Sequence, residues 1–349
     1  MKRLTSVLLI LCLLMTTLPL TALAASRQYV EVTKADAPLR SGNTDKHSVV
    51  VRATKGTVLE VLGTSYNKYL NKWYKVKTAS GSAYIYSGNV KKVNPSGYTT
   101  AITLTKSSVA LNLAGTKKAT LKAVCRYKSR IDANVTWYTS HPKVATVDSK
   151  GNVTAKGPGT CSITARHKIY GTLAYCTVTV TEQRTLGALS REQSNNKCCS
   201  GAVAWSVLKY LRGSSFNKTD LQLFKEMGNS CAVYKVVNIL NKYMGRTAYM
   251  YTRARTQSAY EQAVFASIRA GYPVIALVKI TGSSYFKYTS NGHFTIVSGY
   301  RINPNGTVDF RITDSFKTGK NGGYFWIPSA TFFSYSKAHG YPYYLILKK

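Results

Sequence analysis

The sequence predicts a multidomain protein in which two small all-β segments precede an α+β domain. Residues 29–93 and 102–181 contain short runs in which apolar and polar residues alternate with the period of a strand, separated by turns rich in glycine and asparagine. From residue 187 onward the apolar residues first follow the helical period and then return to the strand period. Helices followed by an antiparallel sheet are the layout of an α+β domain.

The first 24 residues have the features of a secretory signal peptide. Lys2 and Arg3 form a basic start, residues 7–15 an apolar core, and residues 22–24, Ala-Leu-Ala, a cleavage site of small residues. The apolar core is too short to span a bilayer, and no other run is long and apolar enough. We therefore expect a secreted protein with no transmembrane segment in the mature chain.

The chain is strongly basic, with 48 Lys and Arg residues against 13 Asp and Glu and a formal net charge of +35. Such a charge attracts polyanions over long distances. For a secreted protein the expected polyanion is the teichoic acid or anionic glycan of a Gram-positive cell wall. The sequence has no recognisable nucleic-acid motif and no clustered basic helix, so we do not expect nucleic acid as the partner.

Residues 26–93 are predicted to form the first domain. Its characteristic runs are residues 37–42, Ala-Pro-Leu-Arg-Ser-Gly, residues 55–62, Lys-Gly-Thr-Val-Leu-Glu-Val-Leu, residues 72–76, Lys-Trp-Tyr-Lys-Val, and the closing Tyr-Ile at 84–85. These runs resemble the bacterial SH3-like domain. The resemblance implies a small all-β barrel that binds wall peptides or another ligand, with a plain spacer as the alternative.

Residues 98–182 are predicted to form the second domain, an all-β sandwich around Trp137. Residues 135–148, Val-Thr-Trp-Tyr-Thr-Ser-His-Pro-Lys-Val-Ala-Thr-Val-Asp, and the continuation at 151–160 resemble bacterial immunoglobulin-like domains of the intimin/invasin type. The resemblance implies a spacer or adhesive module. We expect His141 and His167 to lie on its surface and not to bind metal.

The α+β domain covers residues 186–349. Helices are predicted at 199–212, 217–227, 232–244 and 258–270, the first three each closed by a glycine. Strands are predicted at 273–280, 293–302, 307–313, 324–327 and 343–347.

The candidate catalytic residues are Cys199, His293 and Asp314, with Gln193 as a fourth. A cysteine in the first turn of a helix faces the positive end of the helix dipole, which lowers its pKa and favours the nucleophilic thiolate. A histidine and an orienting acid further along the chain complete the arrangement that activates a thiol. Gln193 lies six residues before the cysteine, where its amide can reach a developing oxyanion.

The same residues carry a resemblance to the double-glycine-leader (bacteriocin-processing) cysteine peptidases of the papain-like clan. The matching features are Gln193 before Cys199, the helix end Val-Leu-Lys-Tyr-Leu at 207–211, the strand Gly-Tyr-Pro-Val-Ile at 271–275, and Gly-His at 292–293. The resemblance implies a papain-like α+β fold, a triad of cysteine, histidine and the acid Asp314, and an oxyanion hole formed by the glutamine and the backbone amide of the cysteine.

Two positions depart from the family pattern. Ser200 and Gly201 follow the cysteine where the family usually has glycine and proline, and Ser315 follows Asp314 in place of proline. Asp309 is the rival acid. It points to the opposite face of the strand from Phe310 and Ile312, so it should face solvent beside a basic residue, whereas Asp314 shares their inward face.

The cysteine pattern indicates neither a zinc site nor a cofactor. Two disulfides are possible, one within the sandwich and one between Cys198 and Cys231, and the sequence does not decide between bonded and free thiols. Aligning the helix on residues 208–211 places Cys199, not Cys198, at the nucleophile position.

The sequence thus predicts a secreted, wall-associated cysteine peptidase that hydrolyses peptide bonds, with the two β domains targeting it to the wall. One alternative is a peptidoglycan hydrolase that uses the same triad on stem peptides. The other is a surface adhesin or wall-binding protein whose last domain is inactive.

Overall fold

The computed structural model describes residues 27–94, 100–125, 130–131, 134–195, 197–280, 283–286, 288, 290–316, 323–336 and 343–349. The predicted signal peptide, residues 1–24, lies outside these residues. The described part of the chain contains no helix that is both long and apolar enough to cross a membrane. The chain divides into two compact units, of which the second contains the candidate active site.

The first unit is a single antiparallel sheet. Its strands are β1 (Gln28–Val32), β2 (Asp36–Arg40), β3 (Val49–Thr54), β4 (Val58–Tyr66), β5 (Lys72–Thr78), β6 (Gly81–Tyr86) and β7 (Val90–Val93), with the short 3-10 helix η1 (Ser87–Asn89) before the last. The strands pair in the order β3-β2-β6-β5-β4-β1-β7. Among the described residues β3 pairs only with β2 and β7 only with β1, so the predicted barrel is an open sheet in its pairing.

A short turn far along the sequence completes the core of this unit. Residues 167–171 belong to it, and Ile169 is fully buried among Val30, Leu39 and Ile85. His167, predicted to lie on the surface, is 1% exposed. Its Nδ1 accepts hydrogen bonds of 3.1 Å from the backbone amides of Ile169 and Tyr170. The imidazole is buried because these bonds hold it inside the turn.

The second unit begins with the immunoglobulin-like sandwich. Its strands are β8 (Ile102–Leu104), β9 (Ser108–Asn112), β10 (Lys118–Thr120), β11 (Ala123–Cys125), β12 (Arg130–Ile131), β13 (Val135–Thr139), β14 (Ala145–Val147), β15 (Asn152–Ala155), β16 (Gly159–His167) and β17 (Leu173–Thr185). Alternate residues of β16 and β17, such as Ile163 and Val178, are buried in its core. Trp137 is partly buried and packs against both apolar clusters of the sandwich.

Strand β17 continues from the sandwich into the last domain. Its first part pairs with β16 and β9, and its residues Glu182 to Thr185 pair with β20 (Ser290–Ile302). The sheet that results carries the order β17-β20-β19-β23-β18, with β21 added on β20 and β22 on β21. The remaining strands are β18 (Tyr249–Arg253), β19 (Val274–Ile280), β21 (Val308–Thr313), β22 (Tyr324–Pro328) and β23 (Tyr344–Lys348).

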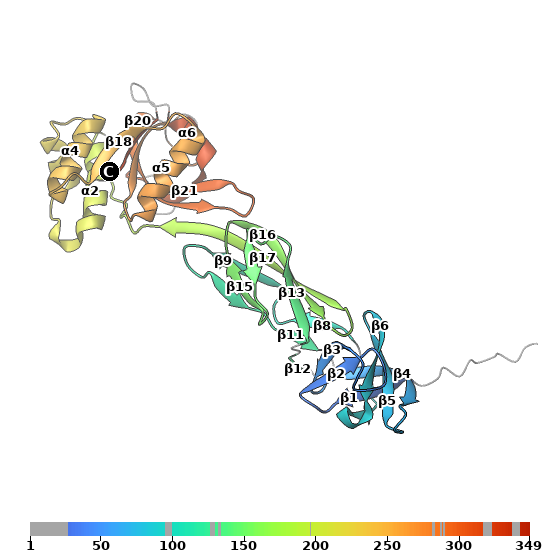
Figure 1. The fold of residues 1–349 in the computed structure, drawn as a ribbon. Helices are drawn as coiled ribbons and strands as arrows, with labels where there is room; N and C mark the ends of the chain where they lie inside the picture. Colours follow the sequence, from blue (N-terminus) through green and yellow to red (C-terminus); the bar gives the residue numbers. More distant parts are fainter. Residues whose placement is uncertain are drawn as a thin grey trace, which may run out of the picture. The chain divides into compact units, whose positions relative to one another are not determined.

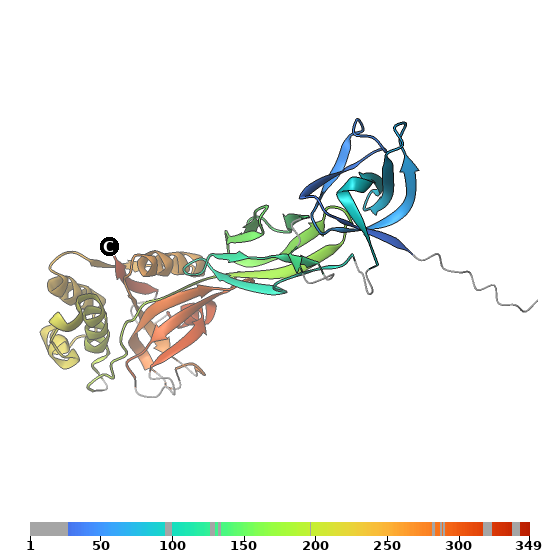
Figure 2. The ribbon, with the colours of Figure 1, turned by 90° about the horizontal axis from the view of Figure 1, so that it is seen from below.

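Helices cover the sheet of the last domain (Figures 1 and 2). They are α2 (Cys199–Arg212), α3 (Asp220–Glu226), α4 (Val233–Met244), α5 (Gln257–Arg269) and α6 (Ser329–Tyr335), with the 3-10 helix η3 (Gly213–Ser215) after α2. The four predicted helices and five predicted strands are all present within a few residues. Strand β18 and helix α6 were not predicted.

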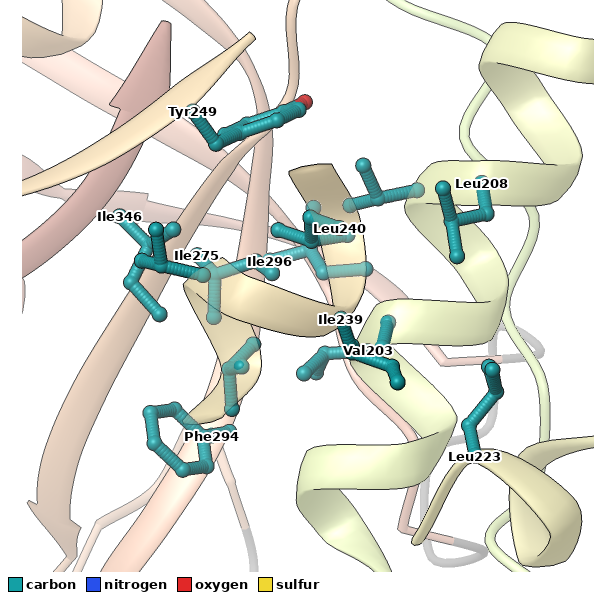
Figure 3. Close-up of a cluster of buried hydrophobic side chains, with 14 of the residues drawn as sticks. Val203, Leu208, Leu223, Ile239, Leu240, Tyr249, Ile275, Phe294, Ile296 and Ile346 are labelled. Carbon is teal, nitrogen blue, oxygen red and sulfur yellow. The ribbon is translucent and has the colours of Figure 1, made fainter. Parts of the chain in front are cut away.

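The strand period sorts the sheet residues into two apolar cores. Ile275 and Ile296 point toward α2 and α4, where they meet Val203, Leu208 and the side chains shown in Figure 3. The neighbouring Val274 and Val297 belong to the other core, with α5 and α6. Cys199 and Phe294 are members of the first core. Packing in that core therefore holds the start of α2 against β20, which carries His293.

Candidate active site

Cys199 is the first residue of α2 and is 7% exposed. Its thiol contacts the backbone amide of Phe294, the peptide link directly after His293, and the amide of Ser200. Both amides stabilise negative charge on sulfur, as does the free N-terminus of the helix. The fold therefore places the predicted nucleophile beside the strand that carries the predicted base.

The buried carboxylate of Asp220 holds the loop that precedes the nucleophile. Arg191 donates to Oδ1 at 2.9 Å, and the backbone amide and hydroxyl of Ser194 donate to its two oxygens at 2.8 and 2.9 Å. The thiol of Cys198 donates to the same group at 3.7 Å. Burial opposes ionisation of Asp220, but these donors hold its pKa below its usual value. Asp220 thus fixes the approach to Cys199.

Gly201 allows this packing. A Cβ atom there would lie 2.2 Å from the carbonyl oxygen of Asp220 and 2.9 Å from the sulfur of Cys198. A glycine inside a helix costs about 1 kcal/mol relative to alanine, so the close approach of α3 accounts for its presence. The departure from the family pattern at Gly201 therefore has a packing reason.

His293 and Asp314 form a buried pair. Nε2 of His293 lies 2.7 Å from Oδ1 of Asp314, and the two residues are each 4% exposed. Because Nε2 is bonded to the carboxylate, Nδ1 is the ring nitrogen left for proton exchange. The alternation along β21 indicated that Asp314 points inward with Phe310 and Ile312, and the structure has it there.

Tyr288 completes the surroundings of the acid. Its hydroxyl donates to Oδ2 of Asp314 at 2.7 Å, so each carboxylate oxygen has one side-chain hydrogen-bond partner. Its ring lies edge-on to the imidazole of His293, with centroids 5.6 Å apart. Burial, and next the charge of Asp314, raise the pKa of Tyr288 far above its ordinary value, so the hydroxyl keeps its proton. No motif or periodicity in the sequence pointed to Tyr288.

The backbone around Asp314 is also fixed. Its amide donates to the carbonyl of Gly323 at 2.7 Å, and the Ser190 hydroxyl donates to its carbonyl at 2.6 Å. Gly323 has a φ of +82°, and a Cβ there would lie 2.2 Å from the Ser190 hydroxyl, so only glycine fits. The rival acid Asp309 faces away and pairs with Arg301, at 2.7 Å between Oδ2 and Nη2.

Gln193 lies beside the end of β21. Its backbone amide donates to the carbonyl of Ser315 at 3.0 Å, and the Ser315 hydroxyl donates to its side-chain oxygen at 3.2 Å. Its side-chain nitrogen donates to the carbonyl of Asn195 at 2.9 Å. Ser315, which replaces the family's proline, thereby ties the glutamine to the segment that carries Asp314.

Cys231 is a second thiol at the nucleophile. Its hydrogen bond with Cys199, followed by burial, raises the pKa of Cys199 well above its ordinary value, opposite to the lowering that the helix N-terminus predicted. The same bond is the largest cause that lowers the pKa of Cys231, to about 6. The two thiols therefore titrate as a pair whose first proton leaves more easily than that of an isolated cysteine and whose second leaves less easily.

Cys198 differs from both. Burial, and then Asp220, raise its pKa to about 12, so it remains a thiol. The structure contains neither predicted disulfide among its described side chains: Cys161, Cys176, Cys198, Cys199 and Cys231 are all free. The suggested bond between Cys198 and Cys231 is absent because Cys198 turns toward Asp220 while Cys231 contacts Cys199. The side chain of Cys125 lies outside the described residues.

No group of three or more potential metal ligands occurs among the described residues. Asp220, Tyr288 and Cys231 are the residues of the site that sequence reasoning missed. For Cys231 the sequence indicated only a possible disulfide with Cys198.

Three family profiles match the chain. They are the bacterial SH3 domain over residues 35–91, the bacterial Ig-like domain (group 2) over residues 98–184, and the Peptidase_C39 like family over residues 175–343. The chain is therefore a multidomain protein with β-rich SH3-like and Ig-like regions before an α+β peptidase-like region. That last region is similar to the Peptidase_C39 like family, in keeping with the resemblance to the double-glycine-leader peptidases that its motifs carry.

Solved structures give weaker likenesses. The bromelain protease from Ananas comosus in complex with the E64 inhibitor aligns at 13% identity and a TM-score of 0.33, over 47% of this chain and 94% of that chain. NlpC2 from Trichomonas vaginalis aligns at 11% identity and a TM-score of 0.16, over 93% and 98% of the two chains. TM-scores this low do not establish a common fold. Curated proteins give no significant match.

Proposed function

We propose that the last domain hydrolyses peptide bonds with Cys199 as nucleophile, His293 as general base and acid, and Asp314 as the orienting acid. The observation that carries the proposal is the buried 2.7 Å hydrogen bond between His293 and Asp314. His293 lies on β20, and the backbone amide of the next residue in that strand, Phe294, contacts the Cys199 thiol. These are the parts that a thiol peptidase needs.

The roles follow from the geometry. His293 accepts the proton of the Cys199 thiol on Nδ1, which leaves Cys199 as a thiolate. The thiolate attacks the substrate carbonyl, and His293 delivers a proton from Nδ1 to the leaving amine. Asp314 keeps the other ring nitrogen protonated and stabilises the imidazolium. The Cys199 amide and Gln193 form the oxyanion hole once Gln193 turns from Asn195.

We further propose that the chain is secreted through residues 1–24 and associates with the cell wall through the SH3-like and Ig-like domains. The basic net charge of +35 supports attraction to an anionic wall. The boundaries 26–93, 98–182 and 186–349 remain the proposed domain limits. A peptidoglycan stem-peptide hydrolase is the second candidate, because the SH3-like domain would bring the same triad to that substrate.

The test compares the mature chain with Cys199→Ala on denatured casein and on purified Gram-positive walls, measuring newly formed amino groups. We expect release from at least one substrate by the wild type and none by the variant, with circular dichroism showing both folded. Release from walls alone selects the second candidate. Equal release by the two proteins refutes the nucleophile, and no release by either, with retained wall binding, supports a non-catalytic wall-binding protein.

A further inference from the structure

The thiol of Cys231 has no part in the proposed triad, yet the fold holds it against the nucleophile. Its sulfur lies 3.6 Å from the carbonyl oxygen of Lys197 and 3.6 Å from the hydroxyl oxygen of Ser200, the residues on either side of the Cys198–Cys199 pair. The Ser200 hydroxyl also donates to the carbonyl of Ser230 at 3.1 Å. The loop between α3 and α4 is thereby pinned onto the first turn of α2.

The two sulfurs also differ in access. Cys231 is exposed, whereas Cys199 is buried and in hydrogen-bonding contact with it. A reagent in solution therefore meets Cys231 first, and any sulfur adduct formed there lies next to the Cys199 thiol. An exposed, readily ionised thiol beside a second, resolving thiol is the arrangement that favours disulfide formation.

We propose that Cys199 and Cys231 form a reversible disulfide that switches the peptidase off, with a small-molecule disulfide such as oxidised glutathione as the oxidant. This rests on the proposed role of Cys199 as the nucleophile. The bond blocks hydrolysis because the sulfur that must attack the substrate is bonded to another sulfur. Reduction by a thiol restores both groups.

The reaction balances in two exchanges. Cys231 releases its proton to solvent, and its thiolate attacks one sulfur of oxidised glutathione. This forms a mixed disulfide and releases one glutathione thiolate, which takes up a proton from solvent. Cys199 then passes its proton to His293 and attacks the Cys231 sulfur, which releases the second glutathione as a thiolate that takes up that proton. The protein has lost two protons and two electrons, and oxidised glutathione has gained them to become two reduced molecules.

The test maps disulfides in the full mature chain after equilibration in buffers of stepped glutathione ratio. Free thiols are then blocked by alkylation, and the chain is cleaved after lysine. Cys198 and Cys199 fall in one peptide, residues 198–209, so the Cys198→Ser variant assigns the linked sulfur. We expect a bond between Cys199 and Cys231 in the wild type and in Cys198→Ser.

Activity follows the same samples and is reversed with dithiothreitol. We expect the wild type to lose about tenfold or more of its reduced activity at a ratio that forms the bond. The ratio of reduced to oxidised glutathione at which half of the activity is lost should change with the total glutathione concentration. This is because two reduced glutathione molecules are released for each disulfide that forms. The activity of Cys231→Ser is compared with that of the same variant in its reduced state. Any loss of activity in this variant should accompany a glutathione adduct on Cys199. That loss should depend only on the ratio of reduced to oxidised glutathione and not on their total concentration.

Three results would overturn the proposal: only a glutathione adduct in the wild type, a bond from Cys198, or the same glutathione dependence in Cys231→Ser. The mapping needs no substrate. If the protein hydrolyses nothing but the bond forms, the proposed function fails while the thiol pairing stands. If hydrolysis depends on Cys199 and no bond forms, the switch fails alone.

Discussion

Replacing Tyr288 by phenylalanine tests whether the hydroxyl beside the triad positions the acid. The change removes one oxygen and leaves Oδ2 of Asp314 without its 2.7 Å donor. Hydrogen bonds to charged groups contribute about 1.5–3 kcal/mol, and this bond is part-buried. If most of that energy is lost when the imidazolium forms, kcat/KM should fall by roughly 10–100-fold.

The pH profile separates positioning from a general loss of structure. Without the tyrosine donor the negative charge at the site is less stabilised, so protonation becomes easier and the acid limb of kcat/KM should move to higher pH. The assay is peptide hydrolysis across pH with the mature chain. Tyr285→Phe is the matched control, because Tyr285 is exposed and three residues away. A uniform fall without movement of the acid limb, or an equal fall in the control, would refute the reasoning.

Four further substitutions test the site. Asp314→Asn should keep the fold and reduce turnover by ~10²–10⁴-fold, whereas Asp309→Asn should leave it nearly unchanged; the reverse ranking in the same assay would implicate another acid. Asp220→Asn should lower the free energy of unfolding by about 2–4 kcal/mol at neutral pH. Because the pKa of Asp220 is lowered in the fold, that difference should shrink as pH falls through the acid range, and a constant difference in urea titrations would contradict it. Cys231→Ala should let alkylation of Cys199 begin at lower pH, since the bond that raises the Cys199 pKa is gone; an unchanged profile by mass spectrometry would argue against the thiol contact.

Local patterns predicted the elements whose boundaries are set by local chemistry. Helix α2 begins at Cys199 and ends before Gly213, whose φ of +62° suits glycine. Strand β18 was missed because Tyr249–Arg253 shows no clean alternation and is largely exposed. Helix α6 was missed because Ser329–Tyr335 is short and rich in serine and aromatic residues, which are weak helix formers.

The site shows the same division between local and tertiary information. The inward direction of Asp314 follows from strand alternation over a few residues, and so it could be predicted. Tyr288 and Asp220 act through partners 26 residues away in sequence, and no period or spacing connects them. Cys231 changes the titration of Cys199 only because the loop before α4 folds onto α2, which cannot be read from local sequence.

The unbroken strand β17 gives the second unit a mechanical property. Asn112 of the sandwich exchanges two hydrogen bonds with the backbone of Gln183, while Arg269 donates to Glu182 at 2.8 Å from the peptidase side. Residues 183–185, which lie between the two proposed domain limits, are therefore strand residues hydrogen-bonded to β20 and do not form a flexible linker. A force along β17 would act in shear on the backbone hydrogen bonds that join it to β20, and it would act on all of them together. Tension applied to the sandwich would therefore reach β20, and with it His293, without a hinge to absorb it.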